Sequence, residues 1–317
     1  EVLPKKVHKD GTEERDLLGS TLLYNQKKKT MKIHMGDYID KMVKKFNMEG
    51  CRKTATPCAP YADLSSGKPD PEFPMRQLVG TLLWLSVMCR PDISFACQRV
   101  AQFADKPNTA VVAAAKRIVK YCVHTREQGI SYSPENEKAF RDTYQKVLDE
   151  HNKENPGDYS TLPDHVSFTD SDFAGDSITL RSTSGSCIFY KGTAIAWSSK
   201  KQSIRALSTA EAEYCGMYDA IRVTQGHGFL NWFMGSGAKL PLTFADNQSA
   251  LAISRAKLVN RKSKHFALRF MLVRDHFKSF GFCPSHLNLA DPFTKGLSAK
   301  KYLQLHDHTL NKDEEDE

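Results

Sequence analysis

The second half of the chain contains an order of predicted elements that few folds accommodate. From residue 165 the apolar pattern alternates as in strands, changes to helical spacing, and then switches between the two again. It predicts three strands, the last two joined by a turn near Lys191–Gly192, then a long helix, a strand, a short helix, a basic amphipathic helix over 263–279, a short strand and a final helix from Leu289. This order is typical of a mixed sheet with helices on its faces. We therefore expect an α/β fold for residues 165–308.

Four carboxylates occupy defined places in this order. Asp170 lies on the first strand, Glu213 early in the long helix, Asp246 at the carboxyl end of the fourth strand and Asp291 in the first turn of the last helix. If the first and fourth strands are neighbours, the four acids meet. Clustered carboxylates raise one another's pKa unless a cation neutralises them. Oxygen ligands of this kind suit Mg²⁺, which also takes phosphate oxygens as ligands.

Two such ions about 3.5–4 Å apart would form a clamp for phosphodiester hydrolysis, without a protein nucleophile. Each acid also has an alternative interpretation, because a lone Asp near a strand end is more often a turn or cap residue. Asp291 can equally be a first-turn acid favoured by the helix dipole. Ser208 and Glu211 have the spacing of a capping box, so we assign Glu211 to the helix start and Glu213 to the metal site.

Basic residues flank the predicted acids on both sides. Such runs are usually solvated faces, but beside a metal cluster they are suited to holding phosphates. Asn247 and Gln248 follow Asp246 and are candidates for minor-groove contacts. The net charge of +8 is compatible with a polyanionic partner, although it is common in unrelated proteins. The basic candidates for nucleic-acid binding are Lys200, Lys201, Arg205, Arg261, Lys262 and Lys264.

The rest of the chain divides into three segments. Residues 1–132 are predicted to be mainly helical, with Ile39, Met42, Val43 and Phe46 on one helical face. Residues 133–164 are polar, with one weak amphipathic helix, and are expected to form a linker or an insertion. Residues 309–317 are expected to be a disordered acidic tail.

Composition and cysteine spacing argue against a membrane-spanning protein and against a zinc site built from cysteines. No run reaches the roughly 18 apolar residues of a membrane helix, so no membrane partner is expected. The eight cysteines lack zinc-ligand spacing and are expected to be reduced, buried thiols of an intracellular protein. The three tryptophans lie among apolar neighbours and are expected in the core. The chain begins with Glu1 and no leader, so we interpret it as part of a longer one.

Seven ordered motifs over about 165–300 resemble the RNase H region of copia-type LTR-retrotransposon Pol polyproteins. The resemblance implies an RNase H-like fold with a five-stranded mixed sheet, Mg²⁺ or Mn²⁺ as cofactor, and RNA–DNA hybrid as substrate. It also implies a cytoplasmic or nuclear location, and acidic metal ligands at Asp170, Glu213, Asp246 and Asp291. The motifs are FTDSDFAGD, RSTSGSCIFY, IAWSSKKQS, LSTAEAEY, ADNQSA, KSKHFALR and LADPFTKGL.

Residues 15–132 resemble the thumb and connection region of the same polyproteins. The family's Tyr-x-Asp-Asp polymerase motif is absent, so we expect no DNA synthesis by this chain and an upstream polymerase domain as its partner. A catalytically inactive retroelement remnant that binds nucleic acid is the alternative function. A transposase or integrase of related fold would also use clustered acids. The oligomeric state stays open, and His286 is either a loop residue for product release or a surface histidine.

Overall fold

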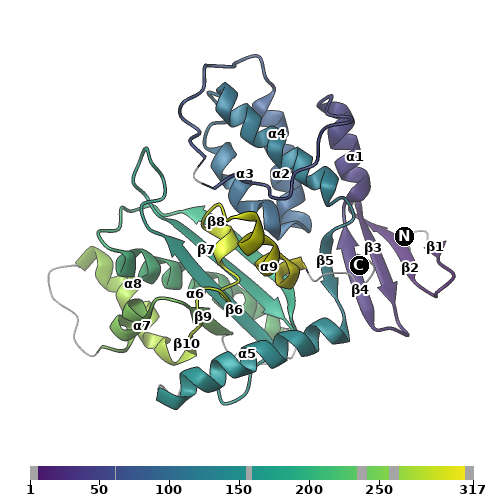
Figure 1. The fold of residues 1–317 in the computed structure, drawn as a ribbon. Coiled ribbons are helices and arrows are strands. Elements are labelled where there is room, and N and C mark those ends of the chain that lie inside the picture. The colour runs from purple at the N-terminus through teal and green to yellow at the C-terminus, as the bar shows by residue number, and fades with distance from the viewer. Residues whose placement is uncertain (1–5, 61, 155–158, 234–240, 257–263, 311–317) are drawn as a thin grey trace. The chain divides into compact units, whose positions relative to one another are not determined.

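The chain folds into two compact units. The computed structural model describes residues 6–60, 62–154, 159–233, 241–256 and 264–310 (Figure 1). Unit 1 comprises Glu1–Glu137 and Gly296–Glu317, and unit 2 comprises Lys138–Lys295. Within the described residues each unit contains one five-stranded sheet, so the protein is mixed α/β.

The sheet of unit 1 is antiparallel throughout and was missed by the sequence analysis, which predicted a mainly helical segment over 1–132. Most residues of its strands are only half-buried, and β2, with the sequence EERDL, buries none of its five residues. A strand without a buried face gives no apolar alternation to detect. In sheet order the strands are β1 (Lys6–Val7), β2 (Glu13–Leu17), β3 (Ser20–Asn25), β4 (Thr30–His34) and β5 (Gly129–Tyr132).

The helices predicted in unit 1 are confirmed. Ile39 and Met42 are buried on one face, as their spacing indicated, and Asn108 caps the fourth helix by accepting a hydrogen bond from the Val111 N–H. Trp84 was predicted in the core, but 44% of it is exposed. The helices are α1 (Gly36–Lys45), α2 (Met75–Met88), α3 (Ser94–Ala101), preceded by the 3-10 turn η1 (Pro91–Ile93), and α4 (Thr109–His124).

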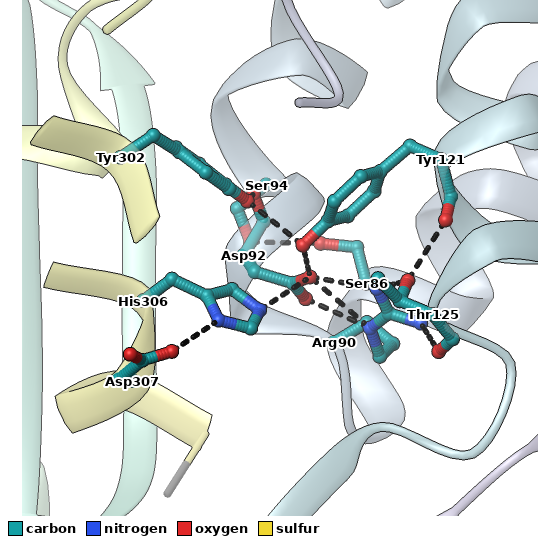
Figure 2. A network of polar contacts seen from close by, with 9 residues as sticks. All are labelled: Ser86, Arg90, Asp92, Ser94, Tyr121, Thr125, Tyr302, His306 and Asp307. Atoms are coloured by element: carbon teal, nitrogen blue, oxygen red, sulfur yellow. Dashed lines mark hydrogen bonds and ion pairs between the residues drawn. The ribbon is translucent and has the colours of Figure 1, made fainter. Parts of the chain in front are cut away.

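A buried ion pair in unit 1 is surrounded by polar contacts from several elements (Figure 2). The side chains of Arg90 and Asp92 are 0% and 2% exposed, and the guanidinium donates to the carboxylate at 2.7 Å. Tyr121 donates to the same carboxylate oxygen at 2.7 Å, and Tyr302 donates to the Asp92 carbonyl at 3.0 Å. His306 lies 3.7 Å from the carboxylate. The network therefore satisfies a buried charge pair from several elements at once.

Helix α9 (Ala299–Leu310) belongs to unit 1 because it supplies Tyr302 and His306 to this network. The domain predicted over 165–308 extends past the end of unit 2, which is at Lys295. The predicted final helix from Leu289 is also wrong: a 3-10 turn, η3 (Asp291–Phe293), comes first, and the helix begins at Ala299. The aromatic residues of α9 form their polar contacts with residues of η1 and α4. No local sequence pattern predicts these contacts.

Replacing Asp92 with Asn should destabilise the protein by about 3–5 kcal/mol, because the Arg90 charge then stays buried without its counter-ion. Urea unfolding of the full chain measures the effect. Asp105→Asn is the matched control, since Asp105 pairs with Arg76 at the surface, where both side chains are at least 75% exposed. It should change stability little. Equal effects of the two substitutions would contradict the structural role of the buried pair.

The His306 ring should make the stability of unit 1 depend on pH. Burial opposes its charged form, but the carboxylates of Asp307 and Asp92, 3.6 Å and 3.7 Å from the ring nitrogens, outweigh burial and raise the pKa of His306 above its ordinary 6.5, against the charge of Arg90. A raised folded-state pKa stabilises the protein fully below pH 6.5, and this contribution is lost as pH rises through the folded pKa. Tyr121 and Tyr302 also face the ring, edge-on and tilted.

We therefore expect His306→Gln to flatten the loss of stability between pH 6 and 9. Urea unfolding followed by the fluorescence of Trp84, with Trp197 and Trp232 replaced by Phe, reports on unit 1 alone. A parallel pH dependence in the wild type and the variant would contradict the expectation.

The sheet of unit 2 confirms the five strands predicted after residue 165. It is mixed: β6 and β9 are parallel, β9 and β10 are parallel, and the β6–β7 and β7–β8 pairs are antiparallel. The turn predicted at Lys191–Gly192 has positive φ at both residues. The sheet order is β10 (Phe280–Phe282), β9 (Leu242–Ala245), β6 (His165–Asp172), β7 (Thr183–Tyr190) and β8 (Thr193–Lys201).

Helix α5 (Pro134–Glu154) covers part of one face of this sheet. Phe140 and Tyr144 pack on Phe168 of β6, with ring centroids 6.3 Å and 4.8 Å away, and Phe140 stacks on Phe189 of β7. The segment predicted as a polar linker or insertion over 133–164 thus contains a helix with a buried aromatic face. The weak amphipathic helix predicted in this segment is therefore present, and Phe140, Tyr144, Val147 and Leu148 form its buried face.

Three helices form a second core with the other side of the sheet. Tyr214 and Met217 of α6 pack with Leu251 of α7, Val273 of α8 and Phe280 of β10. These helices are α6 (Thr209–Phe233), α7 (Gln248–Arg255) and α8 (Lys264–Asp275). The long helix, the short helix and the basic helix are therefore all present where the sequence predicted them.

Most of the cysteines are buried, as their sequence positions predicted. All eight cysteines are free thiols, six of them buried, with Cys51 and Cys58 half-buried. In the part of the chain that the structure describes, every helix is too short or too polar to cross a membrane.

Candidate metal centre

Two of the predicted acids are brought together by the parallel pairing of β6 with β9. In this pairing Thr169 lies opposite Ala245, so Asp170 and Asp246 follow on adjacent strands at the same edge. Parallel neighbours end at one edge of a sheet, which places their last side chains close together. Asp170 is 2% exposed, whereas Asp246 is half-buried.

Glu213 reaches the same point because α6 lies close to β6. A Cβ on Gly216 would be 2.5 Å from the Ser171 Oγ, so the approach requires a residue without a side chain. Gln202, at the end of β8, donates to the Ser184 Oγ and to the Ala212 carbonyl at 2.9 Å each. The start of α6 is therefore tied to the sheet next to Glu213.

The three carboxylates form a compact set of oxygen donors. Three carboxylate oxygens, one each from Asp170, Glu213 and Asp246, lie within 4.8 Å of one another. Glu213 is 4% exposed, and its Oε2 has no hydrogen-bond partner among the described residues. A buried carboxylate oxygen without a donor is costly, and a divalent cation would satisfy it. The donor set therefore fits a hard cation such as Mg²⁺.

Burial and mutual repulsion dominate the electrostatics of this cluster. Burial, with the charges of Asp291 and Asp246, raises the pKa of Asp170 to about 7 against the opposing charge of Lys295. Burial, with the charges of Asp170 and Asp246, raises the pKa of Glu213 to about 10. Shifts of this kind mark carboxylates whose ionised forms need a cation.

Asp291 lies next to this cluster but outside the set of three. It is fully buried in the 3-10 turn η3, and its Oδ1 is 2.9 Å from the Lys295 Nζ. The same ammonium is 3.3 Å from the Asp170 Oδ2. The predicted place of Asp291 in the first turn of the last helix is wrong, because that helix begins at Ala299. Lys295 therefore links Asp291 to Asp170.

The segment 288–295 is fixed against β6 by hydrogen bonds. Asn288 donates to the Thr169 carbonyl at 3.0 Å, and the Thr294 hydroxyl donates to the Asp170 Oδ2. Gly185, which is paired with Asp170 on β7, leaves the space for it: a Cβ there would lie 2.6 Å from the Thr294 Cγ2. The approach of this segment therefore depends on a strand glycine.

The distinction between Glu211 and Glu213 is upheld by the geometry. The Leu207 N–H donates to Glu211 at 2.7 Å, and the Glu211 N–H donates to the Ser208 Oγ at 3.2 Å. Glu211 thus stabilises the start of α6, as predicted.

Some of the residues predicted to contact nucleic acid are exposed, and others already form contacts within the protein. Lys200, Arg205 and Gln248 are exposed. Lys201 is paired with Asp176, and Asn247 is the N-cap of α7, accepting from the Ala250 N–H at 2.9 Å. These local roles use the groups that were expected to contact nucleic acid. Arg261, Lys262 and the side chain of Lys264 lie outside the described residues.

Sequence reasoning missed four residues that build the site: Gln202, Asn288, Thr294 and Lys295. All but Asn288 lie inside the quoted motifs IAWSSKKQS and LADPFTKGL. His286 is exposed, and its role stays a prediction.

Comparison with known proteins gives the chain's relatives. It is 25% identical over 277 residues to the retrovirus-related Pol polyprotein from transposon TNT 1-94 of Nicotiana tabacum, and 30% identical over 269 residues to that from transposon RE1 of Arabidopsis thaliana; each match covers 82% of this chain. Its homologues are retrovirus-related Pol polyproteins of plant transposons.

The chain spans a small share of these two polyproteins and is also similar to a shorter protein. The chain spans 18% and 17% of the length of these two polyproteins. It is also 29% identical over 213 residues to an uncharacterized mitochondrial protein of Arabidopsis thaliana, covering 66% of this chain and 75% of that protein. No protein-family model matches the chain.

Two glycines of α6 provide a matched test of the close approach to β6. An alanine at Gly216 meets the Ser171 Oγ, whereas an alanine at Gly226 meets no atom within 4 Å. Both substitutions gain the same helix propensity, so Gly216→Ala should be about 1–3 kcal/mol less stable than Gly226→Ala because of overpacking. Thermal or urea unfolding measures the difference, and equal stabilities would show that α6 does not need this contact.

Proposed function

We propose that unit 2 is a ribonuclease H domain that hydrolyses the RNA strand of RNA–DNA hybrids, using Mg²⁺ or Mn²⁺. The observation that carries the proposal is the cluster of Asp170, Glu213 and Asp246, with oxygens within 4.8 Å and a Glu213 oxygen that has no donor among the described residues. The RNase H-like fold and the copia-type origin belong to the same proposal. The mixed sheet order and the Pol polyprotein homologues support them.

The residues divide the work by their contacts. Asp170, Glu213 and Asp246 would hold the ion, which when bound would neutralise the carboxylates and stabilise negative charge on phosphate oxygens. Thr294 and Lys295 hold Asp170 in its orientation through one carboxylate oxygen. Because Asp170 and Glu213 are buried, their side chains need little ordering when substrate binds.

In this proposal exposed basic side chains bind the phosphates. Lys200 lies on β8, and Arg205 lies between β8 and α6; both side chains are exposed. Contacts of this kind give affinity that falls with salt and carries little sequence preference. Recognition of the hybrid itself would need contacts to 2′-hydroxyl groups.

Unit 1 would be the thumb and connection region of the same polyprotein, with an upstream polymerase domain as partner. The support is the span of the homology, which covers 82% of the chain and therefore includes residues of both units. In this proposal the protein acts inside cells during reverse transcription, and the buried Arg90–Asp92 network is structural.

The test is cleavage of an end-labelled RNA strand in an RNA–DNA hybrid by the full chain, with and without Mg²⁺. Wild type should cut the hybrid and leave duplex DNA intact. Asp170→Asn, Glu213→Gln and Asp246→Asn should each lower the rate by more than about 100-fold, since removing even an outer partner of a metal ligand costs 10–100-fold. Circular dichroism checks that each variant is folded.

Glu211→Gln is the matched control for Glu213→Gln, because both acids lie on α6 and only Glu211 caps the helix. It should cleave like wild type. If wild type and Asp170→Asn cleave equally little while both bind hybrid, the chain is a nucleic-acid-binding module instead. DNA strand transfer without cleavage of the hybrid would indicate a transposase or integrase.

A further inference from the structure

Lys295 occupies an unusual place for a lysine, between two almost fully buried carboxylates. Its Nζ is 2.9 Å from the Asp291 Oδ1 and 3.3 Å from the Asp170 Oδ2. The side chain is 36% exposed, whereas those of Asp291 and Asp170 are 0% and 3% exposed. The ammonium thus approaches from the solvent side and bridges both acids.

The backbone places this ammonium. Asp291 begins the turn η3, and Lys295 follows four residues later, so both side chains emerge from one short segment. The Thr294 hydroxyl donates its single proton between two acceptors, the Asp170 carboxylate and the Asp291 carbonyl, which lies 3.0 Å from the hydroxyl oxygen. The segment is therefore held with the Lys295 side chain directed at Asp170.

The charges in the site are arranged asymmetrically. On one side Asp170 and Asp291 share the Lys295 ammonium. On the other side Glu213 has an oxygen with no donor among the described residues, and Asp246 is half-buried. Asp170 belongs to both sides, since it contributes to the cluster of three oxygens and to the lysine bridge. The site therefore has one position filled by a cation of the chain itself, and one that is open to an added cation.

We propose that Lys295 is a positioning residue that serves as the resident cation of the site. It offsets part of the negative charge of Asp170 and Asp291 in the metal-free protein and competes with a divalent ion for that pair. A first divalent ion then binds to Asp170, Glu213 and Asp246, and a second one binds only when the ammonium moves away. This inference rests on the proposed function, since it assumes that the three acids hold a divalent ion.

The test compares wild type with Lys295→Met, using the full chain. In EDTA the variant should melt about 5 °C or more below wild type, because two buried carboxylates lose their counter-ion. Titration with Mn²⁺ by calorimetry should show one ion per wild-type chain. In the variant it should show at least about tenfold tighter binding and a second ion, since the competing charge is gone.

Three further variants serve as controls. Lys138→Met removes an exposed lysine of α5 and should match wild type in both measurements. Lys295→Arg keeps the charge and should melt closer to wild type in EDTA than Lys295→Met does. If Lys295→Met does not fold in EDTA, the double variant Asp291→Asn/Lys295→Met, which removes one acid together with the cation, should regain stability.

The inference is overturned if Lys295→Met melts in EDTA at the wild-type temperature, or if it binds Mn²⁺ no more tightly than wild type. Failure of both proteins to bind Mn²⁺ also overturns it. Cleavage of the hybrid is measured separately. A wild type that binds Mn²⁺ as expected but does not cut would sink the proposed function while leaving the role of Lys295 intact.

Discussion

The parallel pairing of β6 with β9 sets the central constraint in unit 2, because it brings Asp170 and Asp246 to one edge of the sheet. Two neighbouring carboxylates repel each other, and burial makes each charge harder to maintain. Glu213 and Asp291 add further negative charge at the same place. The helices and loops around this edge therefore have to supply positive charge themselves or leave the carboxylates accessible to an added cation. The Lys295 ammonium is the part of that charge that the chain supplies itself.

Close backbone packing makes this concentration of charge geometrically achievable. Gly216 lets α6 approach one face of β6, and Gly185 lets the segment 288–295 approach the other side beside Asp170. Side-chain hydrogen bonds from Gln202 and Asn288 then fix both approaches to the sheet. The acids are consequently held by secondary structure packed at short range, which suits a site that must keep its geometry when a ligand binds.

Unit 1 also buries a carboxylate, and the comparison separates two uses of buried charge. Asp92 is fully paired with Arg90, whose charge outweighs the effect of burial and holds the pKa of Asp92 below its usual range. In unit 2, burial raises the pKa of Asp170 to about 7 even though Lys295 is adjacent. The first arrangement is electrically complete and stabilises the packing of α9. The second leaves negative charge uncompensated, as expected for a site that binds a cation.

The sequence by itself determined the order of elements after residue 165, the turn at Lys191–Gly192, the helix cap at Ser208 and Glu211, and the acids that meet. These features depend on local spacing, which a sequence displays directly. Tertiary structure alone decided the rest: the exposed strands of unit 1, the buried face of α5, the membership of α9 in unit 1, and the bridge made by Lys295. Each of these depends on a partner distant in the chain, or on a surface that buries nothing. The repulsion between Asp170 and Asp291 could be foreseen from their types, but only the fold shows which cation lies between them.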